Sequence, residues 1–441
     1  MRLPQVWKRA VGMACSRSSL LLAAQVTGAG LVFVAWAFYS RIVPLSSATI
    51  GIEAFALGTI LYLPVSLGLP FIAANLFRRD PPDQNIGSAG ALVMLVLTSS
   101  AVVAAIGMVS SIFAICSHTS SSIGMGFLLG SAGSVGVMLQ QLARIRMSVW
   151  KMLFASSVNV TLPCAFSLTV LLNLSAAASQ VIVLGIVAFY GLGVGAVCCR
   201  VIRPRLVLRK SATKRLLVSA IPLVPHLLAF SFLMQGLRVQ AVLSGASSEV
   251  LAASHYLMVV LNAGLVVISS IHGLLSVRVQ TASQKEFWSM VQSNAGSYAT
   301  LAVLSSIVTV ASLRSPLVRV FEGLPIPSYV VLAGLCVGIA ALCSYYFLSS
   351  ICIREGEALL LATVSTSTAI LVVVAQTILG FESLNSLVAL YAISLAVLPV
   401  LLSILMFVLM RRVKWVLRAG IKALPFALAP AAVMILLHWG V

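Results

Sequence analysis

Long apolar runs alternate with short polar turns along almost the whole chain. A helix needs roughly 20 apolar residues to cross a membrane, and the runs lack the alternation of a membrane β-strand. Because unpaired backbone amides are costly in lipid, the runs predict helices. We expect twelve spans, at 20–39, 48–74, 88–115, 122–142, 150–173, 179–199, 216–236, 250–276, 295–313, 328–352, 357–379 and 386–410. A shorter thirteenth apolar run covers 424–439.

The composition fits this pattern. Of the 441 residues, 61% are hydrophobic and 8% are charged, whereas a soluble domain has about 25% charged residues. The sequence therefore predicts an all-α, polytopic membrane protein. The first run follows a basic N-terminus, and the Ala35-Trp36-Ala37 stretch resembles a signal-peptide cleavage site. The many later spans favour a retained first span.

The basic residues predict the orientation. An N-terminus in the cytoplasm puts 24 of the 28 Lys and Arg residues on the cytoplasmic side, as the positive-inside rule requires. The exceptions are Arg41, Arg238, Arg314 and Arg319. Basic turns against an anionic inner leaflet then explain the net charge of +19, and no nucleic-acid partner is expected.

A dense basic segment at 200–215 divides the spans into two sets of six. We expect a basic cytoplasmic N-terminus at 1–19, a first six-helix lobe at 20–199, the linker at 200–215, a second lobe at 216–410, and a basic turn with an extra apolar segment at 411–441. The hairpin Trp36–Arg79 has a loose echo in Met234–Arg278, which supports a pseudo-two-fold pair of lobes.

Catalytic motifs are missing from the sequence. It contains no GxSxG, Walker, HExxH or CxxC pattern, and its nine acidic residues fall mostly in predicted loops and span ends. We therefore expect no enzyme activity, no metal and no cofactor. The eight cysteines are interpreted as small packing residues. The small residues at 124–136 predict close helix packing.

The candidate site residues are ionisable groups in or beside spans. Arg41 and Arg238 either grip a phosphate group, or snorkel and cap their own helices. Glu53 either pairs with Arg41 or faces the outer water. His226 is a substrate contact, because ionisable groups at such depth are often functional, or a neutral histidine bonded to a neighbouring carbonyl. Four further arginines guard the inner entrance or only set topology, namely Arg78, Arg144, Arg278 and Arg354.

These residues lie in stretches that resemble the bacterial polysaccharide flippases, a family of the multidrug/oligosaccharidyl-lipid/polysaccharide exporter superfamily. FYSRIVPLSSATIGIEAFALGTILYLPVSLGLPFIAANLFRR resembles the first hairpin of that family, with matches at Arg41, Pro44, Gly51 and Gly68. LLVSAIPLVPHLLAF resembles its proline-bearing seventh helix at Pro222 and Pro225. The next stretch resembles its Asp-Arg…Gly…Tyr pattern, at Arg238, Gly245 and Tyr256, with Leu237 in place of the acid.

The resemblance implies a bacterial inner-membrane protein that moves an undecaprenyl-pyrophosphate-linked oligosaccharide from the inner to the outer leaflet for surface polysaccharide synthesis. Its expected partners are this lipid-linked glycan, membrane lipids, and the polysaccharide polymerase and chain-length machinery. Two alternatives remain open, a cation-coupled drug exporter of the same superfamily and a membrane glycan polymerase or ligase. The short external turns argue against the last, and the scarcity of acids within spans argues against the exporter.

Overall fold

The computed structural model describes residues 17–72, 82–117, 122–146, 148–202, 210–281, 297–298, 300–309, 311–313, 321, 325, 327–379 and 382–410. Within these ranges the chain is helical and contains no strand, which confirms the predicted all-α class. Arg78, Arg314, Arg319 and the apolar run 424–439 lie outside the described residues, as does the N-terminus up to residue 16.

The helices follow the predicted spans. The first half contains α2 (Arg17–Ile42), α3 (Leu45–Val65), α5 (Pro82–Cys116), α6 (Ser122–Arg146), α7 (Val149–Ser156), α8 (Val158–Leu171) and α9 (Ala176–Ile202). The second half contains α10 (Lys210–Ala220), η1 (Ile221–Leu223), α11 (Val224–Met234), α12 (Gly236–Leu243), α13 (Ser248–Thr281), α15 (Tyr329–Glu355), α16 (Ala358–Leu379) and α17 (Leu384–Met410).

Among the described residues, nine helices are long and apolar enough to cross a membrane, and the bent pair α7–α8 makes a tenth. At the other two predicted positions lie α13, with 34 residues, and the shorter apolar helix Thr300–Leu313. Charged residues gather where α2 begins, α6 and α9 end, and α10 begins. We call this side of the bundle the basic end, which is the predicted cytoplasmic side.

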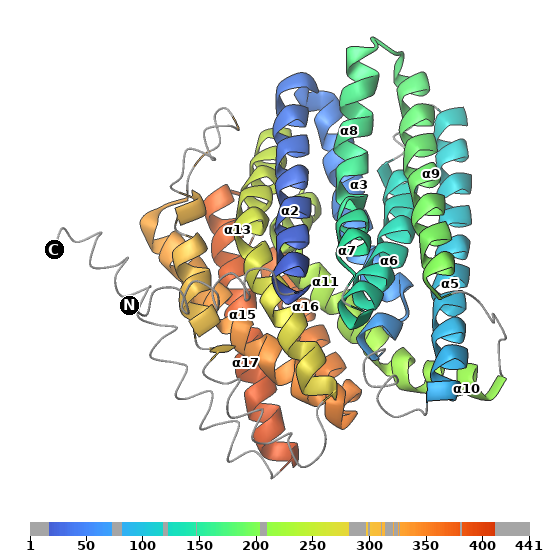
Figure 1. The fold of residues 1–441 in the computed structure, drawn as a ribbon. Coiled ribbons are helices and arrows are strands. Elements are labelled where there is room, and N and C mark those ends of the chain that lie inside the picture. Colours follow the sequence, from blue (N-terminus) through green and yellow to red (C-terminus); the bar gives the residue numbers. More distant parts are fainter. Residues whose placement is uncertain are drawn as a thin grey trace, which may run out of the picture.

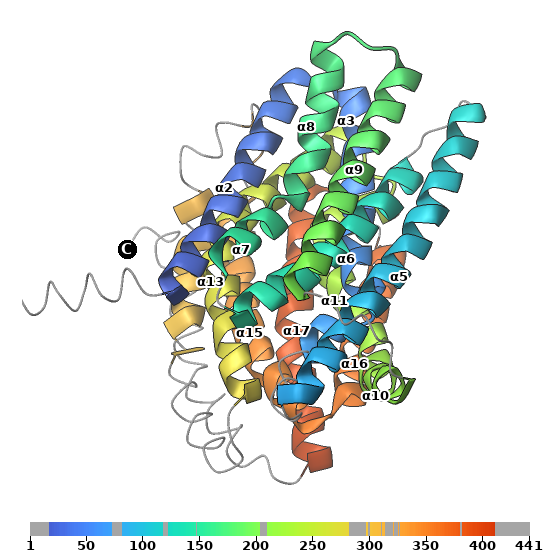
Figure 2. The ribbon, with the colours of Figure 1, turned by 45° about the vertical axis from the view of Figure 1, so that its right-hand side comes forward.

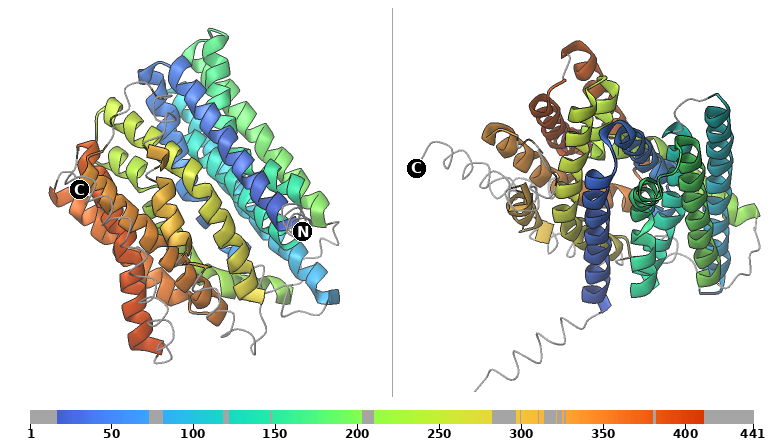
Figure 3. Two further views of the ribbon diagram at one scale, coloured as in Figure 1. Left: turned by 60° about the vertical axis from the view of Figure 1, so that its left-hand side comes forward. Right: turned by 90° about the horizontal axis from the view of Figure 1, so that it is seen from above.

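The helices form two groups (Figures 1–3). In the N-terminal group α6 packs against α3, α5 and α9, and α2 packs against α8. In the C-terminal group α15 and α16 pack against α17, and α11 packs against α16. The groups meet where α13 contacts α2 and α3, and where α3 contacts α11 and α12. The exact division at 200–215 stays a prediction.

Glycines let α3 and α6 approach closely, as the small-residue spacing predicts. A Cβ atom at Gly126, Gly130 or Gly133 would lie 2.8 Å from a side-chain atom of α3. Lipid provides little hydrophobic force between helices, so such backbone proximity is a main source of packing energy in a membrane. The α3–α6 pair thus fixes the wall of the N-terminal group that faces the other group.

Two spans are broken at places that matter for the interior. The helices α7 and α8 meet at an angle of 44°. In the second half, Pro222 and Pro225 lie in η1 and the first turn of α11, and Gln235 separates α11 from α12. Gly236 lets α12 pack closely against α17, because a Cβ there would come within 2.8 Å of the Tyr391 ring. The short helix α12 can therefore sit between the two groups.

We predict that Gly130→Ala destabilises the protein, because the added methyl group would meet Leu61 at 2.8 Å. Overpacking of this kind costs about 1–3 kcal/mol. The midpoint temperature of unfolding in detergent, followed by size-exclusion chromatography, should fall by several degrees. Gly193→Ala is the matched control, since a Cβ there meets nothing within 4 Å. Equal losses for both variants would contradict the close-packing account.

Candidate functional site

A central cavity of about 310 Å³ lies between the two helix groups. Residues from α2, α3, α6 and α8 line one side, and residues from α12, α13 and α15 line the other. Along α2 the lining runs from Gln25 to Trp36, a distance of about 16 Å at 1.5 Å per residue. Toward the basic end the lining reaches Arg144, two residues before the end of α6, and toward the opposite end it reaches Trp36, six residues before the end of α2.

The lining of this cavity is polar and cationic. Its only charged residues among the described part of the chain are Arg144 and Arg238, and no Asp or Glu joins them. Five side-chain amides add hydrogen-bonding capacity, from Gln25, Gln140, Asn159, Gln235 and Asn262. The sequence analysis did not predict these amides as site residues, although several of them lie within apolar runs, where polar side chains are often functional. Such a wall suits an anion that also carries polar groups.

Arg238 marks the deep end of the central cavity. It lies on α12 and is 1% exposed. Its Nη1 donates a hydrogen bond to Gln235 Oε1 at 2.8 Å, and its guanidinium carbon lies 4.9 Å from the centre of the Phe55 ring. Its Nε is buried without a hydrogen-bond partner. The amide oxygen and the ring satisfy this cation only in part.

Arg144 comes from the other helix group and lies nearer the basic end. Its guanidinium carbon would be 2.8 Å from a Cβ at Gly273, so the group rests directly against the backbone of α13. Arg144 Nε is also buried without a hydrogen-bond partner. The cavity thus receives one arginine from each group, Arg144 from α6 and Arg238 from α12.

The structure separates the two arginines that sequence reasoning had paired. Arg41 is exposed in the last turn of α2 and lines a different cavity of about 740 Å³, together with Glu249 and Tyr256. This outer cavity lies at the end opposite the basic end. Glu53 is half-buried on α3, lines neither cavity, and forms no ion pair with Arg41. Arg238 therefore has Arg144, and not Arg41, as its counterpart in the central cavity.

An aromatic cluster separates the central cavity from the outer cavity. Its members are Trp36, Tyr39, Phe55, His255, Tyr256 and Phe321. The Trp36 ring, from the N-terminal group, lies 4.0 Å from the ring of His255 in the C-terminal group, centroid to centroid. Both residues are fully buried. In this structure, contacts between the two helix groups therefore close the central cavity off from the outer cavity.

His226 lies within the C-terminal group, away from the aromatic cluster. Its Nδ1 is 3.0 Å from Ser365 Oγ on α16 and 3.3 Å from the Tyr345 hydroxyl on α15. It lines a small chamber of about 190 Å³ that also contains Arg144. The predicted substrate role of His226 is therefore compatible with its position, although the residue is not in the central cavity.

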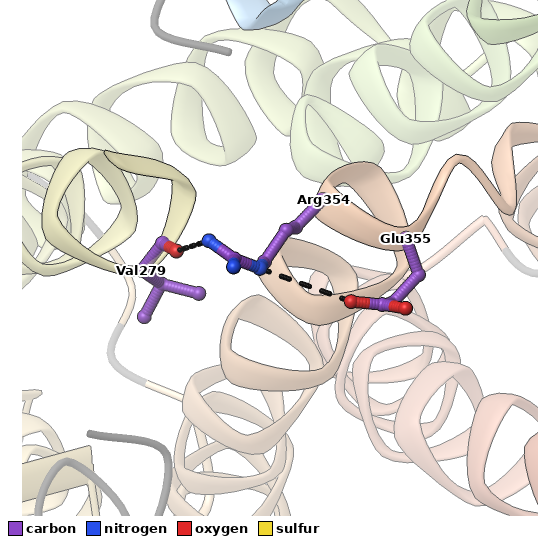
Figure 4. Close-up of polar contacts among 3 residues, drawn as sticks. All are labelled: Val279, Arg354 and Glu355. Carbon is purple, nitrogen blue, oxygen red and sulfur yellow. Dashed lines mark hydrogen bonds and ion pairs between the residues drawn. The ribbon is translucent and has the colours of Figure 1, made fainter. Parts of the chain in front are cut away.

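The remaining arginines that we expected at the inner entrance differ in their setting. Arg354 is 5% exposed at the end of α15. Its Nη1 donates to the Val279 carbonyl at 2.7 Å, and its Nε lies 3.8 Å from Glu355 Oε1 (Figure 4). Arg354 thus fastens α15 to α13. Arg278 belongs to α13, and its side chain lies outside the described part.

Within the described part of the chain, no group of three or more His, Cys, Asp or Glu residues lies close enough to hold a metal ion. The described cysteines are all free thiols. Cys198 and Cys352 pack in the interior as predicted, whereas Cys116 and Cys164 are exposed and do not.

We predict that Trp36→Ala opens the closure on the outer side, because the aromatic contacts that Trp36 makes across the groups would be lost. A reporter cysteine, introduced as Asn262→Cys in the central cavity, measures this. A membrane-impermeant thiol reagent applied at the end opposite the basic end should label it about tenfold faster.

Phe154→Ala, which removes an aromatic ring that packs on Tyr190 outside the cluster, is the control. Peptide mass spectrometry distinguishes the reporter from native cysteines. Unchanged labelling in the Trp36→Ala protein would show that the cluster is not the closure.

Comparison with known proteins gives no match by sequence to any family model or to any curated protein. Solved structures do match by fold. A mutant of the Vibrio cholerae MATE transporter VcmN aligns with a TM-score of 0.56 and 12% identity, over 91% of this chain and 98% of that chain. The eukaryotic MATE transporter AtDTX14 gives a TM-score of 0.55 and 12% identity, over 92% and 98%.

A third structure is a MOP superfamily transporter from Pyrococcus furiosus, described as having a binding pocket of reverse polarity that suggests a different function. It aligns with a TM-score of 0.54 and 12% identity, over 93% of this chain and 96% of that chain. At such identities the likeness concerns the backbone. The chain has the fold of the MATE and MOP superfamily transporters over nearly its whole length.

Proposed function

We propose that this protein is a transporter that moves an anionic, phosphate-bearing amphiphile across the membrane, with a lipid-linked oligosaccharide as its substrate. One observation carries the proposal. The cavity between the two helix groups contains two arginines and, among the described residues, no carboxylate to neutralise them.

The physical reason is the cost of a buried charge. An ion that is removed from water must be paired and hydrogen-bonded, or the state that holds it is destabilised. Arg144 and Arg238 each keep a buried Nε without a partner. A phosphate or pyrophosphate group accepts two parallel hydrogen bonds from a guanidinium, which remains charged in a desolvated site. The substrate would therefore complete the site.

The arrangement suggests an order of events. The anion first meets Arg144 near the basic end and then moves deeper to Arg238. The glycan occupies the polar cavity between the groups, while the hydrocarbon tail stays in the lipid. The groups then rock about their interface, the aromatic cluster parts, and the cavity opens on the opposite side. The cycle is a shift between two conformational states and requires no chemistry on the substrate.

A cation-coupled drug exporter is the second candidate, and the fold comparison favours it. The solved structures with this fold include one described as a multidrug resistance MATE family transporter, with a TM-score of 0.50 and 12% identity. A cationic drug or coupling cation needs a negative partner in the cavity. The two arginines of the central cavity would repel it. The Pyrococcus transporter, whose pocket of reverse polarity is described as suggesting a different function, shows that this fold occurs with more than one pocket polarity.

The proposed setting is the bacterial inner membrane, with the basic end in the cytoplasm. The partners are the lipid-linked glycan and the surrounding lipids, and the polymerase and chain-length machinery would take over the glycan on the outer face. The resemblance of the stretches around Arg41 and Arg238 to the polysaccharide flippases supports this choice.

We predict that Arg144→Gln and Arg238→Gln each slow translocation at least tenfold, because each removes a positive charge that the anion needs. The purified protein in liposomes would be given a fluorescent, short-chain prenyl-pyrophosphate sugar, with flipping followed by chemical quenching from outside. Arg200→Gln, an exposed arginine at the basic end, is the matched control. Efficient transport of a fluorescent organic cation, insensitive to both central substitutions, would favour the drug exporter.

Gly273→Ala should weaken the site without changing a charge. A Cβ at Gly273 would lie 2.8 Å from the Arg144 guanidinium carbon, so the methyl group displaces the guanidinium. We expect flipping to slow about three- to tenfold. Gly334→Ala is the control in the same helix group, because its Cβ would meet its nearest neighbour at an ordinary 3.9 Å. If the Gly273→Ala protein flipped the substrate at the wild-type rate, the observed position of Arg144 would not be the one used in transport.

A further inference from the structure

The small chamber of about 190 Å³ adjoins the central cavity on the side of the C-terminal helix group. Arg144, Ser269 and Tyr346 line both spaces, so Arg144 stands where they meet. The other walls come from α11, α13 and α15. A typical pocket for a drug-sized ligand is about 300–1,000 Å³, so the chamber has room for one ring-sized group.

Stacked rings form much of the chamber wall. The His272 and Tyr346 rings stack with centroids 4.3 Å apart and planes 14° apart. The Phe230 and Tyr345 rings stack at 5.5 Å and 20°. An edge contact of 6.0 Å between Phe230 and Tyr346 joins the two stacks. These contacts hold the rings in place before any ligand arrives, which lowers the entropic cost of binding.

The polar atoms of the chamber favour a ligand with hydroxyl groups. Ser349 Oγ donates to the Tyr346 carbonyl at 3.0 Å, and Ser269 Oγ donates to the Val266 carbonyl at 3.0 Å. Each hydroxyl has thus used its hydrogen, and its oxygen can only accept a further hydrogen bond. A phosphate group at neutral pH offers almost no hydrogen to these oxygens. A sugar hydroxyl does.

His272 adds a further polar atom. Its Nδ1 lies 2.8 Å from the Tyr298 hydroxyl, and its Nε2 has no hydrogen-bond partner among the described residues. An imidazole can donate or accept at that nitrogen, depending on its tautomer, and a hydroxyl group can match either choice. The chamber lining contains no carboxylate among the described residues and one cation, Arg144. The chamber lining is therefore complementary to a neutral ring that carries several hydroxyl groups and is attached to an anion.

We propose that the chamber binds the sugar ring attached directly to the phosphate of the substrate, while Arg144 holds that phosphate at the chamber mouth. A pyranose ring has an apolar C–H face for the aromatic wall and a rim of hydroxyl groups for the serine oxygens and His272. The inference rests on the proposed function and makes it more specific, since the recognised unit is a glycosyl phosphate and not a phosphate alone. The sugar next to the phosphate then contributes to specificity.

Binding of small probes to the full-length protein in lipid nanodiscs tests this. The probes are inorganic phosphate, glucose 1-phosphate, glucose and phenyl phosphate, measured by isothermal titration calorimetry. We expect glucose 1-phosphate to bind about tenfold more tightly than inorganic phosphate, which corresponds to about 1.4 kcal/mol. Glucose without phosphate should bind far more weakly than either.

Two variants remove the chamber contribution. Ser349→Leu fills the space, and His272→Gln replaces the imidazole while keeping a polar group. Both should reduce the affinity for glucose 1-phosphate to that for inorganic phosphate, and leave inorganic phosphate binding within twofold of wild type. Thr363→Leu, a polar-to-leucine change at an exposed position of α16, is the control. A purely structural role for Ser349 or His272 would weaken both ligands equally.

Three outcomes would overturn the proposal. Equal binding of inorganic phosphate and glucose 1-phosphate to the wild-type protein would show that the ring is not recognised. Phenyl phosphate binding as tightly as glucose 1-phosphate would assign the chamber to aromatic anions. Equal loss of both ligands in Ser349→Leu would remove the chamber from recognition. Failure of the proposed function looks different, because inorganic phosphate would then show no binding that depends on Arg144.

Discussion

Two arginines on opposite sides of an interface, Arg238 buried and Arg144 half-buried, constrain this molecule more than any other feature. Arg144 and Arg238 face one cavity between the helix groups, and the described lining offers them no carboxylate. Like charges in a poorly solvated space repel each other. Each charge is only partly stabilised by its neighbours. Arg238 donates a hydrogen bond to the Gln235 amide oxygen and lies over the Phe55 ring, and Arg144 lies against the backbone at Gly273. On the proposed function, an anion in the cavity would stabilise this interface by pairing with both arginines.

The rest of the fold explains how these cations reach the interior. Both lie on helices that the sequence has shaped for close approach or for a break. Arg144 is carried on α6, and the glycines of α6 bring this helix close to α3. The Arg144 guanidinium can reach the backbone of α13 because Gly273 has no side chain. Arg238 is carried on α12, which is separated from α11 at Gln235 and packs closely on the Tyr391 ring through Gly236. Glycines thus have two roles: they allow close helix packing, and they leave space for the arginine side chains.

Hydropathy alone predicted the spans, because the cost of unpaired backbone in lipid leaves few alternatives. The lining of the central cavity was predicted only in part. Arg238 was identified because an arginine in an apolar stretch is conspicuous. Arg144 was assigned to the inner entrance, since a basic turn follows it, and nothing in the sequence shows that α6 carries it into the cavity. The pairing of Arg41 with Arg238 relied on matching hairpins. Arg41 ends its helix at the outer cavity, whereas the break at Gln235 leaves Arg238 at the deep end of the central cavity. Local sequence gives no information on depth, which depends on helix breaks and tertiary packing.

Phe55 connects the proposed anion site at Arg238 to the aromatic cluster. Its ring contacts the Arg238 guanidinium on one side and the Trp36 and His255 rings on the other. A cation over an aromatic ring is stabilised by about 0.5–2 kcal/mol, and a bidentate phosphate competes for the same guanidinium with a stronger, charge-assisted interaction. An anion that binds Arg238 therefore weakens a contact on which the closed cluster depends. His255 keeps both ring nitrogens buried without partners, and Trp36 does the same with Nε1; each buried, unmade hydrogen bond costs about 1–3 kcal/mol. Opening the cluster to water would satisfy these groups. On the proposed mechanism, substrate binding thus lowers the cost of leaving the closed state through residues already in contact with each other.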